Sequence, residues 1–123
     1  KVLDQARCGA CHTPSLHTDP AYPVELLADI AAPIYTDMLL HDMGPGFSDG
    51  LSDQSATPSE WRTAPLLGMR FMRTYLHDGR AATVEEAIEL HGGEGSEASG
   101  SVKQFQALDD KRRAQLLAFV AGL

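Results

Sequence analysis

Residues 8–12, Cys8-Gly9-Ala10-Cys11-His12, decide what kind of domain this chain forms. The pattern C-x-x-C-H attaches a c-type haem, because the two thiols add across the porphyrin vinyl groups and the adjacent His12 becomes the proximal iron ligand. The spacer places Cys8 and Cys11 about one helical turn apart, which suits the two vinyl positions. The motif therefore predicts one covalently attached haem c held by Cys8, Cys11 and His12.

Other functions of a cysteine pair fit the sequence poorly. A thioredoxin-like redox pair belongs to a βαβ unit, and no such pattern surrounds residues 8–12. A structural zinc site needs four ligands, usually with a second cysteine pair, and the chain has only 2 cysteines. We therefore interpret the motif as a haem attachment site.

The composition is that of an ordinary globular domain. The chain has 123 residues, 43% of them hydrophobic and 22% charged, which predicts a single domain over residues 1–123. The formal net charge of −7 argues against nucleic acid or anionic membrane surfaces as partners and suits a basic redox partner. The apolar stretches are far shorter than a membrane span.

The start of the chain bears on where the protein works. No signal peptide precedes Cys8, and the first residue is Lys1. Haem c is attached outside the cytoplasm in bacteria, so we expect a periplasmic or extracytoplasmic location. The start suggests a domain taken from a longer precursor, and mature processing explains it equally well.

The helix signals predict an all-α, cytochrome c-like domain whose long loops wrap the haem. Apolar spacing predicts helices over residues 2–11, 24–30, 84–91 and 110–121, with a short one over 102–106 capped by Ser101. The clearest start is Thr83 with Glu86, which form a capping box. No strand pattern of any length is visible. The loops over residues 42–60 and 92–101 are long for a compact domain, and enclosing a haem would explain them.

Asp109 is the expected N-cap of the last helix. The apolar stripe of that helix is formed by Leu116, Leu117 and Val120, which we expect to face the core.

A six-coordinate haem needs a distal ligand, usually methionine or histidine. The candidates are Met38, Met43, Met69, Met72, His17, His41, His77 and His91. We discount His17, which would have to cross the haem plane, and Met38, which resembles a core residue. Met43 lies in a glycine-proline loop and is free to approach. Sequence spacing alone does not distinguish Met69, Met72 and His91 as candidates for the distal ligand.

One structural argument favours His91. It ends a capped amphipathic helix and precedes two glycines, so a rigid element would present the imidazole to a flat macrocycle. The alternative is a histidine that complements the helix macrodipole.

Several further residues are candidates for the haem surroundings. We expect His41 and His77 to lie in turns and to hydrogen-bond near the haem, with a solvated turn as the alternative. Arg62 and Arg80 are our candidates for the propionates, because arginine binds carboxylates bidentately. The single tryptophan, Trp61, is expected in the core or against the haem.

Acidic residues raise the question of a calcium site in the loop over residues 42–60. Asp49, Asp53 and Glu60 are the candidates. They lack EF-hand spacing, so we favour solvated loop acids.

Five runs of sequence together carry a family resemblance. They are residues 35–46 (YTDMLLHDMGPG), 60–66 (EWRTAPL), 76–81 (LHDGRA), 83–88 (TVEEAI) and 91–94 (HGGE). In combination they resemble the carboxy-terminal haem domain of the di-haem oxidoreductase (putative peroxidase) family, a relative of the bacterial di-haem cytochrome c peroxidases. The resemblance covers nearly the whole chain.

The resemblance implies a second ligand and a partner. In the peroxidase relatives, the helix after the His-Asp-Gly turn ends in the methionine that ligates the electron-transfer haem, and the matching residue here is His91. This implies ligation by His12 and His91, with a lower potential than a His/Met pair. The relatives carry two haems and this chain has one motif, so a second haem domain of a parent, or another redox protein, is the expected partner.

The sequence thus predicts a c-type cytochrome domain that transfers single electrons, as one half of a di-haem oxidoreductase. We assign no catalytic residue within the chain itself. Two alternatives stay open: a peroxidase-like iron site with His77 or His41 as acid–base group, and a haem sensor whose distal ligand is displaced by a small molecule.

Overall fold

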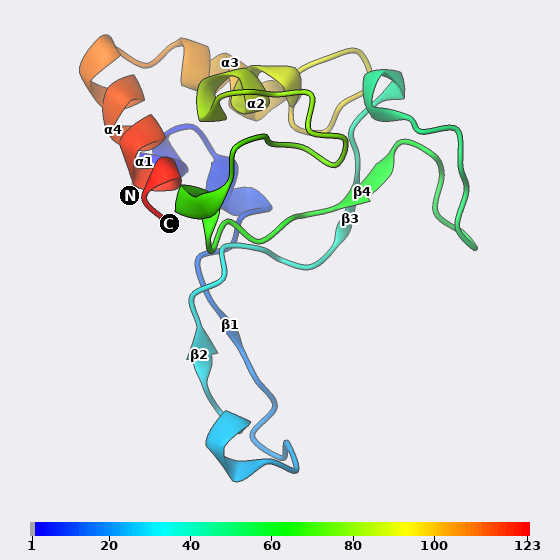
Figure 1. Cartoon of the computed structure of the whole chain (residues 1–123), viewed down its shortest axis with the longest axis vertical. Helices are drawn as coiled ribbons and strands as arrows, with labels where there is room; N and C mark the ends of the chain where they lie inside the picture. The colour runs from blue at the N-terminus through cyan, green and yellow to red at the C-terminus, as the bar shows by residue number, and fades with distance from the viewer. Residues whose placement is uncertain (1) are drawn as a thin grey trace.

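The computed structural model describes residues 2–123, and Figure 1 shows a helical body from which a long hairpin projects. The α-helices in this range are α1 (Val2–Gln5), α2 (Val84–Leu90), α3 (Ser99–Gln106) and α4 (Asp110–Ala121). The strands are β1 (Leu16–His17), β2 (Ala31–Ala32), β3 (Leu40–Asp42) and β4 (Glu60–Arg62). Single 3-10 turns occupy Cys8–Ala10, Glu25–Leu27, Pro45–Phe47 and Met69–Phe71.

The predicted all-α architecture is wrong, because the fold is mixed α/β. β1 pairs antiparallel with β2, placing Leu16 opposite Ala32, and β3 pairs antiparallel with β4, placing His41 opposite Trp61. Strands of two or three residues are too short to show a period-two alternation of apolar residues. Their pairing depends on how the long loops fold back, which the local sequence does not reveal.

The predicted helices with local caps are confirmed. α2 begins after Thr83, whose Oγ1 accepts the Glu86 N–H at 3.1 Å, and α4 begins after Asp109, whose carboxylate accepts the Arg112 N–H at 2.8 Å. The short helix is longer than predicted: α3 starts at Ser99 with Ala98 as N-cap, so the predicted cap at Ser101 is wrong.

Two predicted helices do not form as expected. The first ends at Gln5, because Arg7 adopts φ 58° in the left-handed region and a 3-10 turn over Cys8–Ala10 follows. Residues 24–30 contain only the 3-10 turn Glu25–Leu27. Leu26 in that turn is 85% exposed, so the predicted apolar face has no core to pack against, and such packing supplies most helix stability.

The hydrophobic core joins the first helix to the last three. Its buried residues are Leu3, Ala6, Val84, Phe105, Leu116 and Val120. Leu116 and Val120 lie in the predicted stripe of α4, and Leu117 packs beside them while partly exposed. Tyr35 also packs against this core, where its ring meets Phe119 edge-on at 5.8 Å between centroids. Through Tyr35 the core supports the loop that leads to the candidate site.

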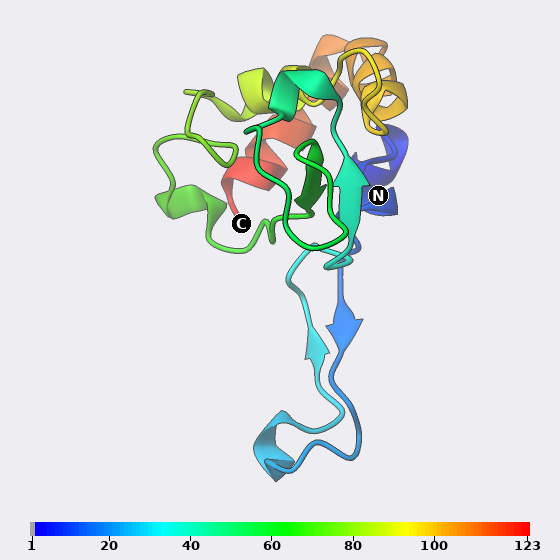
Figure 2. The same cartoon turned by 90° about the vertical axis from the view of Figure 1, so that its right-hand side faces the viewer.

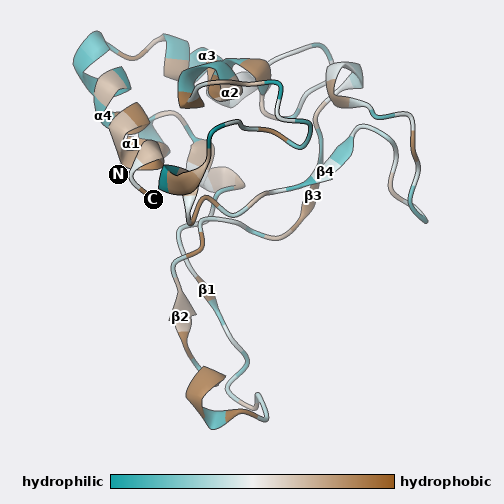
Figure 3. Ribbon diagram, in the orientation of Figure 1, coloured by the Kyte–Doolittle hydropathy of each residue, from teal (hydrophilic) through white to brown (hydrophobic). Residues whose placement is uncertain are grey.

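The projecting hairpin, residues 14–34, is called the arm below. Figures 1 and 2 show β1 and β2 leaving the body side by side, with the Glu25–Leu27 turn at the tip, and Figure 3 colours that tip as hydrophobic. None of residues 14–34 is buried. In the described part of the chain, no helix combines the length and hydropathy needed to cross a membrane.

Gly44 is a position where the fold demands glycine. It adopts φ +77°, and a Cβ there would collide with the Glu94 carbonyl oxygen. We expect Gly44→Ala to lower the free energy of unfolding by about 2 kcal/mol or more, through left-handed strain and overpacking. Urea denaturation followed by circular dichroism measures this. Gly46→Ala is the matched control, because a Cβ at Gly46 meets nothing within 4 Å. Equal losses in both variants would contradict the packing argument.

Candidate haem site

The candidate site begins at His12, directly after the attachment motif. Nδ1 of His12 lies 3.1 Å from the Tyr35 carbonyl oxygen, and the His12 N–H donates to the Cys8 carbonyl at 2.9 Å. Burial lowers the pKa of His12, with partial opposition from the Tyr35 carbonyl. The ring is therefore neutral at pH 7, and a proton on Nδ1 leaves Nε2 as the nitrogen available to a metal.

His91 repeats this arrangement from a different part of the chain. It is the C-cap residue of α2, and its Nδ1 lies 2.6 Å from the carbonyl oxygen of Ala87, one turn earlier in the helix. Burial also lowers the pKa of His91. A neutral imidazole does not complement the helix macrodipole, which weakens the alternative interpretation of this residue.

The two imidazoles lie at a separation that suits a metal ion between them. Their ring centroids are 6.5 Å apart, with an angle of 55° between the ring planes. A five-membered ring with bonds of roughly 1.33 Å has its centre about 1.1 Å from each atom, and metal–imidazole bonds are about 2.0–2.1 Å long. Two imidazoles on opposite sides of one metal therefore have centres about 6.2–6.4 Å apart. The donor set and its spacing fit a bis-histidine haem.

The two cysteines are positioned for attachment to one flat group. Cys8 begins the 3-10 turn and Cys11 is its C-cap, and side chains three residues apart lie on the same side of such a turn. Both thiols are free. Burial raises the pKa of each, so both are protonated at neutral pH. Disulfide exchange needs a thiolate, so this environment disfavours a disulfide between them.

An aromatic cluster connects His91 to two other predicted site residues. The buried Phe47 ring has its centroid 6.2 Å from that of His91 and 5.9 Å from that of His77. His77 stacks on Trp61 at 3.7 Å, with the planes 15° apart, and the indole N–H donates to the Phe47 carbonyl at 3.0 Å. Sequence reasoning missed Phe47. Its only sequence signal is an aromatic residue directly after the Gly-Pro-Gly run.

The two predicted propionate arginines separate in the structure. The Arg80 guanidinium lies 5.4 Å over the Phe47 ring and donates to the Gly46 carbonyl at 2.8 Å. Asp78 orders the predicted turn before it, where its carboxylate accepts the Arg80 N–H at 3.1 Å. Arg62 instead contacts the Met38 sulfur at 3.4 Å. Neighbouring residues of a strand point to opposite faces, so Arg62 and Trp61 diverge.

The alternative axial ligands lie in other settings. Met69 packs against the hydrophobic core, and Met72 and Met38 are 55% and 46% exposed. Met43 lines a small cavity of about 270 Å³ beside Phe47. His17 lies on the arm, where it faces Asp29 at 3.7 Å. Among the described residues, His91 is the candidate whose ring contacts that of His12.

His41 belongs to β3 rather than to the predicted turn, and it lies between two carboxylates. Its Nε2 is 2.9 Å from Asp37, its Nδ1 is 2.8 Å from Glu97, and Nδ1 also lies 3.8 Å from the Cys11 sulfur. The hydrogen bond with Glu97 raises the pKa of His41, and Asp37 adds to the effect against the opposing effect of burial. Donation from both nitrogens requires the imidazolium. We call Asp37, His41 and Glu97 the His41 clamp.

The His41 clamp predicts a pH-dependent contribution to stability. Because the folded pKa is raised, the contribution is complete below the unfolded pKa of about 6.5 and is lost as pH rises through the folded pKa. We expect His41→Gln to lower the free energy of unfolding most near pH 6, with the difference from the parent shrinking toward about pH 9. Denaturation curves across that range test this. The exposed His17→Gln is the control, and a difference that grew with pH would refute the clamp.

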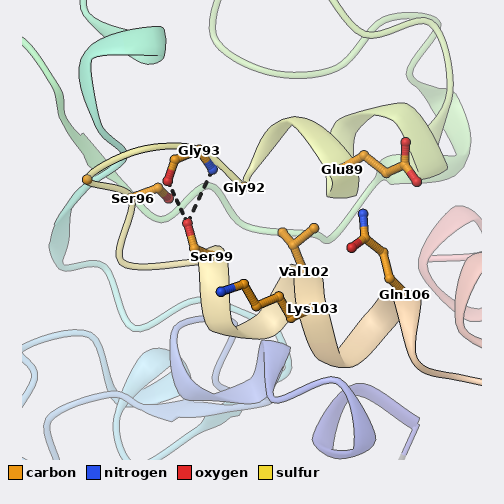
Figure 4. A pocket seen from close by; sticks show the side chains of 9 residues that line it. Glu89, Gly92, Gly93, Ser96, Ser99, Val102, Lys103 and Gln106 are labelled. Atoms are coloured by element: carbon orange, nitrogen blue, oxygen red, sulfur yellow. Dashed lines mark hydrogen bonds between the residues drawn. The ribbon is translucent and has the colours of Figure 1, made fainter.

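The loop after His91 is held against α3. Figure 4 shows Ser99 bonded to Gly93, where its Oγ donates to the carbonyl at 2.7 Å and accepts the N–H at 3.2 Å. A cavity of about 720 Å³ opens here between α2 and α3. A Cβ at Gly92 would lie 3.2 Å from Val102, so this glycine serves the packing of the loop on α3.

The acidic residues Asp49, Asp53 and Glu60 are not part of the group that has metal-ligand spacing in the structure. Within residues 2–123, the one cluster with metal-ligand spacing is Cys11, Asp37 and His41, which overlaps the clamp. The Asp49 carboxylate accepts a backbone N–H from Leu51, and Glu60 accepts one from Thr57. These loop acids serve as local caps.

Comparison with known protein families identifies a family that covers this chain. The profile of a family described as "Di-haem oxidoreductase, putative peroxidase" matches residues 1–123, the whole chain. No curated protein and no solved structure gives a significant match. The match agrees with a site that offers two cysteines and two neutral imidazoles.

Proposed function

Because the chain belongs to the di-haem oxidoreductase family, we propose that it is a c-type cytochrome domain that carries single electrons on one covalently attached haem. The family supports haem binding and a redox role. The observation that carries the finer proposal is the His12–His91 pair, with centroids 6.5 Å apart and each Nδ1 against a main-chain carbonyl.

Each residue of the site has a defined task in this proposal. Cys8 and Cys11 would supply the thioether links to a haem, and His12 and His91 would hold its iron through ring nitrogens. A bound haem contributes a one-electron couple at its iron, with a potential below that of a His/Met haem. The contacts with Tyr35 and Ala87 hold both imidazoles in one orientation and one tautomer, so little in the protein has to move when the charge changes.

Arg80 is the chain's own candidate for a propionate. Its Nη1 is engaged by the Gly46 carbonyl and its Nε by Asp78, which fixes the plane of the guanidinium beside Phe47. An arginine fixed in this way recognises a carboxylate with little loss of side-chain entropy. Arg62 contacts the Met38 sulfur, so we rank it after Arg80, and its role at a propionate stays a prediction.

We place the domain in a larger redox protein. The family is di-haem and residues 1–123 contain one attachment motif, so the second haem lies on another domain of the parent or on another redox protein. A strong sixth ligand blocks peroxide from the iron, so we assign peroxide chemistry to that second haem. Covalent haem attachment also supports a periplasmic or extracytoplasmic location.

A spectroelectrochemical titration of the holoprotein tests the proposal. We expect one reversible one-electron transition, no change on adding CO to the reduced protein, and no peroxide consumption by this domain. Rapid CO binding would instead favour the sensor or peroxidase alternatives, because it requires an open or labile iron position.

A further inference from the structure

The arm has the composition of a surface that another protein covers. Its tip exposes five large apolar side chains within nine residues, with Leu26 the most exposed at 85%; the others are Tyr22, Val24, Leu27 and Ile30. No residue of the arm is buried, and a two-stranded hairpin without a core is only marginally stable in water. Clustered apolar groups of this kind mark interaction sites.

The arm is shaped in advance for binding. Four of the 7 prolines of the chain lie in it: Pro14, Pro20, Pro23 and Pro33. Proline restricts the unbound chain, which lowers the entropy lost on docking. Thr18 fixes the hairpin twice, since its N–H donates to the Ile30 carbonyl at 3.0 Å and its Oγ1 accepts the Ile30 N–H at 2.9 Å.

Both ends of the arm are fixed at the axial histidine. His12 lies two residues before Pro14, and Tyr35, directly after Ile34, provides the carbonyl that holds the His12 ring. The Tyr35 N–H also donates to the Pro14 carbonyl at 3.4 Å, which closes the base. A protein that binds the tip of the arm is therefore held at a fixed position relative to His12.

We propose that the arm docks into an apolar groove with a basic rim on the parent's domain that carries the second haem. The identity of this partner rests on the proposed function, since two haems that exchange electrons must be held at a fixed separation. Residues 14–34 contain Asp19, Glu25 and Asp29 and no lysine or arginine. Because interfaces are electrostatically complementary, an acidic arm indicates basic residues around the groove of the partner.

The same charges disfavour a second copy of this chain as the occupant. A two-fold symmetric contact between arms would bring each acidic tip against its equal. The whole chain is acidic as well, with a formal net charge of −7 that includes the three acids of the arm, so an arm that docks on another copy meets net repulsion.

Site-specific photocrosslinking in the intact parent holoprotein tests this inference. The photoreactive residue p-benzoylphenylalanine replaces Leu26 at the tip, and in a separate protein it replaces Leu51, an exposed leucine of another loop at 73%. We expect irradiation to link position 26 to peptides of the domain with the second attachment motif, and position 51 to give no such link. In the protein with the photoreactive residue at position 26, the additional substitution Leu27→Glu places a charge in the apolar tip and should abolish the link.

Every other result overturns the inference. A product of doubled mass would show that a second copy occupies the arm, and a link to the helical body or no link would show an arm without this partner. The visible spectrum of the holoprotein of residues 1–123, recorded apart from the second haem, separates the two proposals. A low-spin, CO-inert haem in that protein, with no link in the parent, would refute the docking alone, and an open iron in that protein, with the link present in the parent, would refute the proposed ligation alone.

Discussion

Removal of the His91 imidazole is expected to convert a six-coordinate, low-spin haem into one with an open position. In His91→Ala the haem stays attached, because Cys8, Cys11 and His12 are unchanged, and the reduced protein should bind CO rapidly. His91→Met should retain a closed iron and raise the reduction potential by an amount on the order of 0.1 V, since axial ligand identity is a main determinant of haem potential. Optical titration with and without CO measures both effects.

The methionine candidates provide matched controls for His91. Met43→Leu and Met72→Leu preserve volume and should leave the spectrum and the CO response unchanged. Loss of the low-spin spectrum in either variant, together with an unchanged His91→Ala spectrum, would move the sixth ligand to that methionine.

Loss of both attachment cysteines is expected to abolish the covalent link. In the double variant Cys8→Ser, Cys11→Ser, expressed with a functional haem c maturation system, acid–acetone should extract any haem from the polypeptide, while the parent retains it. Each single variant should keep one thioether and a shifted absorption spectrum. Mass spectrometry of the denatured chain measures attachment directly.

The control for attachment is His17→Gln, which alters a histidine on the arm and should keep a full haem adduct. A haem adduct of normal mass on the double variant would contradict the role of the two cysteines, because the chain contains no other thiol.

Local signals predicted the helices that have their own caps. Thr83 and Asp109 start α2 and α4 as expected, because a side-chain cap is encoded within three residues of the helix it begins. The strands had no comparable signal. β3 meets β4 across a loop, and the pairing of His41 with Trp61 depends on the whole path between them.

Backbone strain explains why the first predicted helix ends early, and it recurs near the candidate site. Arg7, Tyr35 and Leu76 adopt positive φ values of 58°, 54° and 70°, although none is glycine. A left-handed backbone conformation costs a non-glycine residue about 1–2 kcal/mol in isolation. Because residue propensities disfavour this conformation, they do not predict it at these three positions. Arg7 directly precedes Cys8, and Leu76 directly precedes His77. Tyr35 holds His12 through its carbonyl oxygen. Strain of this kind gathers at functional sites, where the surrounding packing supports it.

The predictions for the candidate site rest on a motif and on a family pattern. The attachment motif marked Cys8, Cys11 and His12, and the resemblance marked His91. Contacts between distant segments were not predictable, because no local pattern records them: His41 meets Glu97 across 56 positions of sequence, and Phe47 reaches His91 from a different loop.

The most direct test of the central claim is the visible to near-infrared spectrum of the purified holoprotein, oxidised and then reduced, with and without CO. Ligation by His12 and His91 predicts low-spin spectra in both states, no far-red methionine–iron band and no response to CO. A methionine–iron band would contradict His91 as the ligand. High-spin iron or ready CO binding would contradict the closed electron-transfer site.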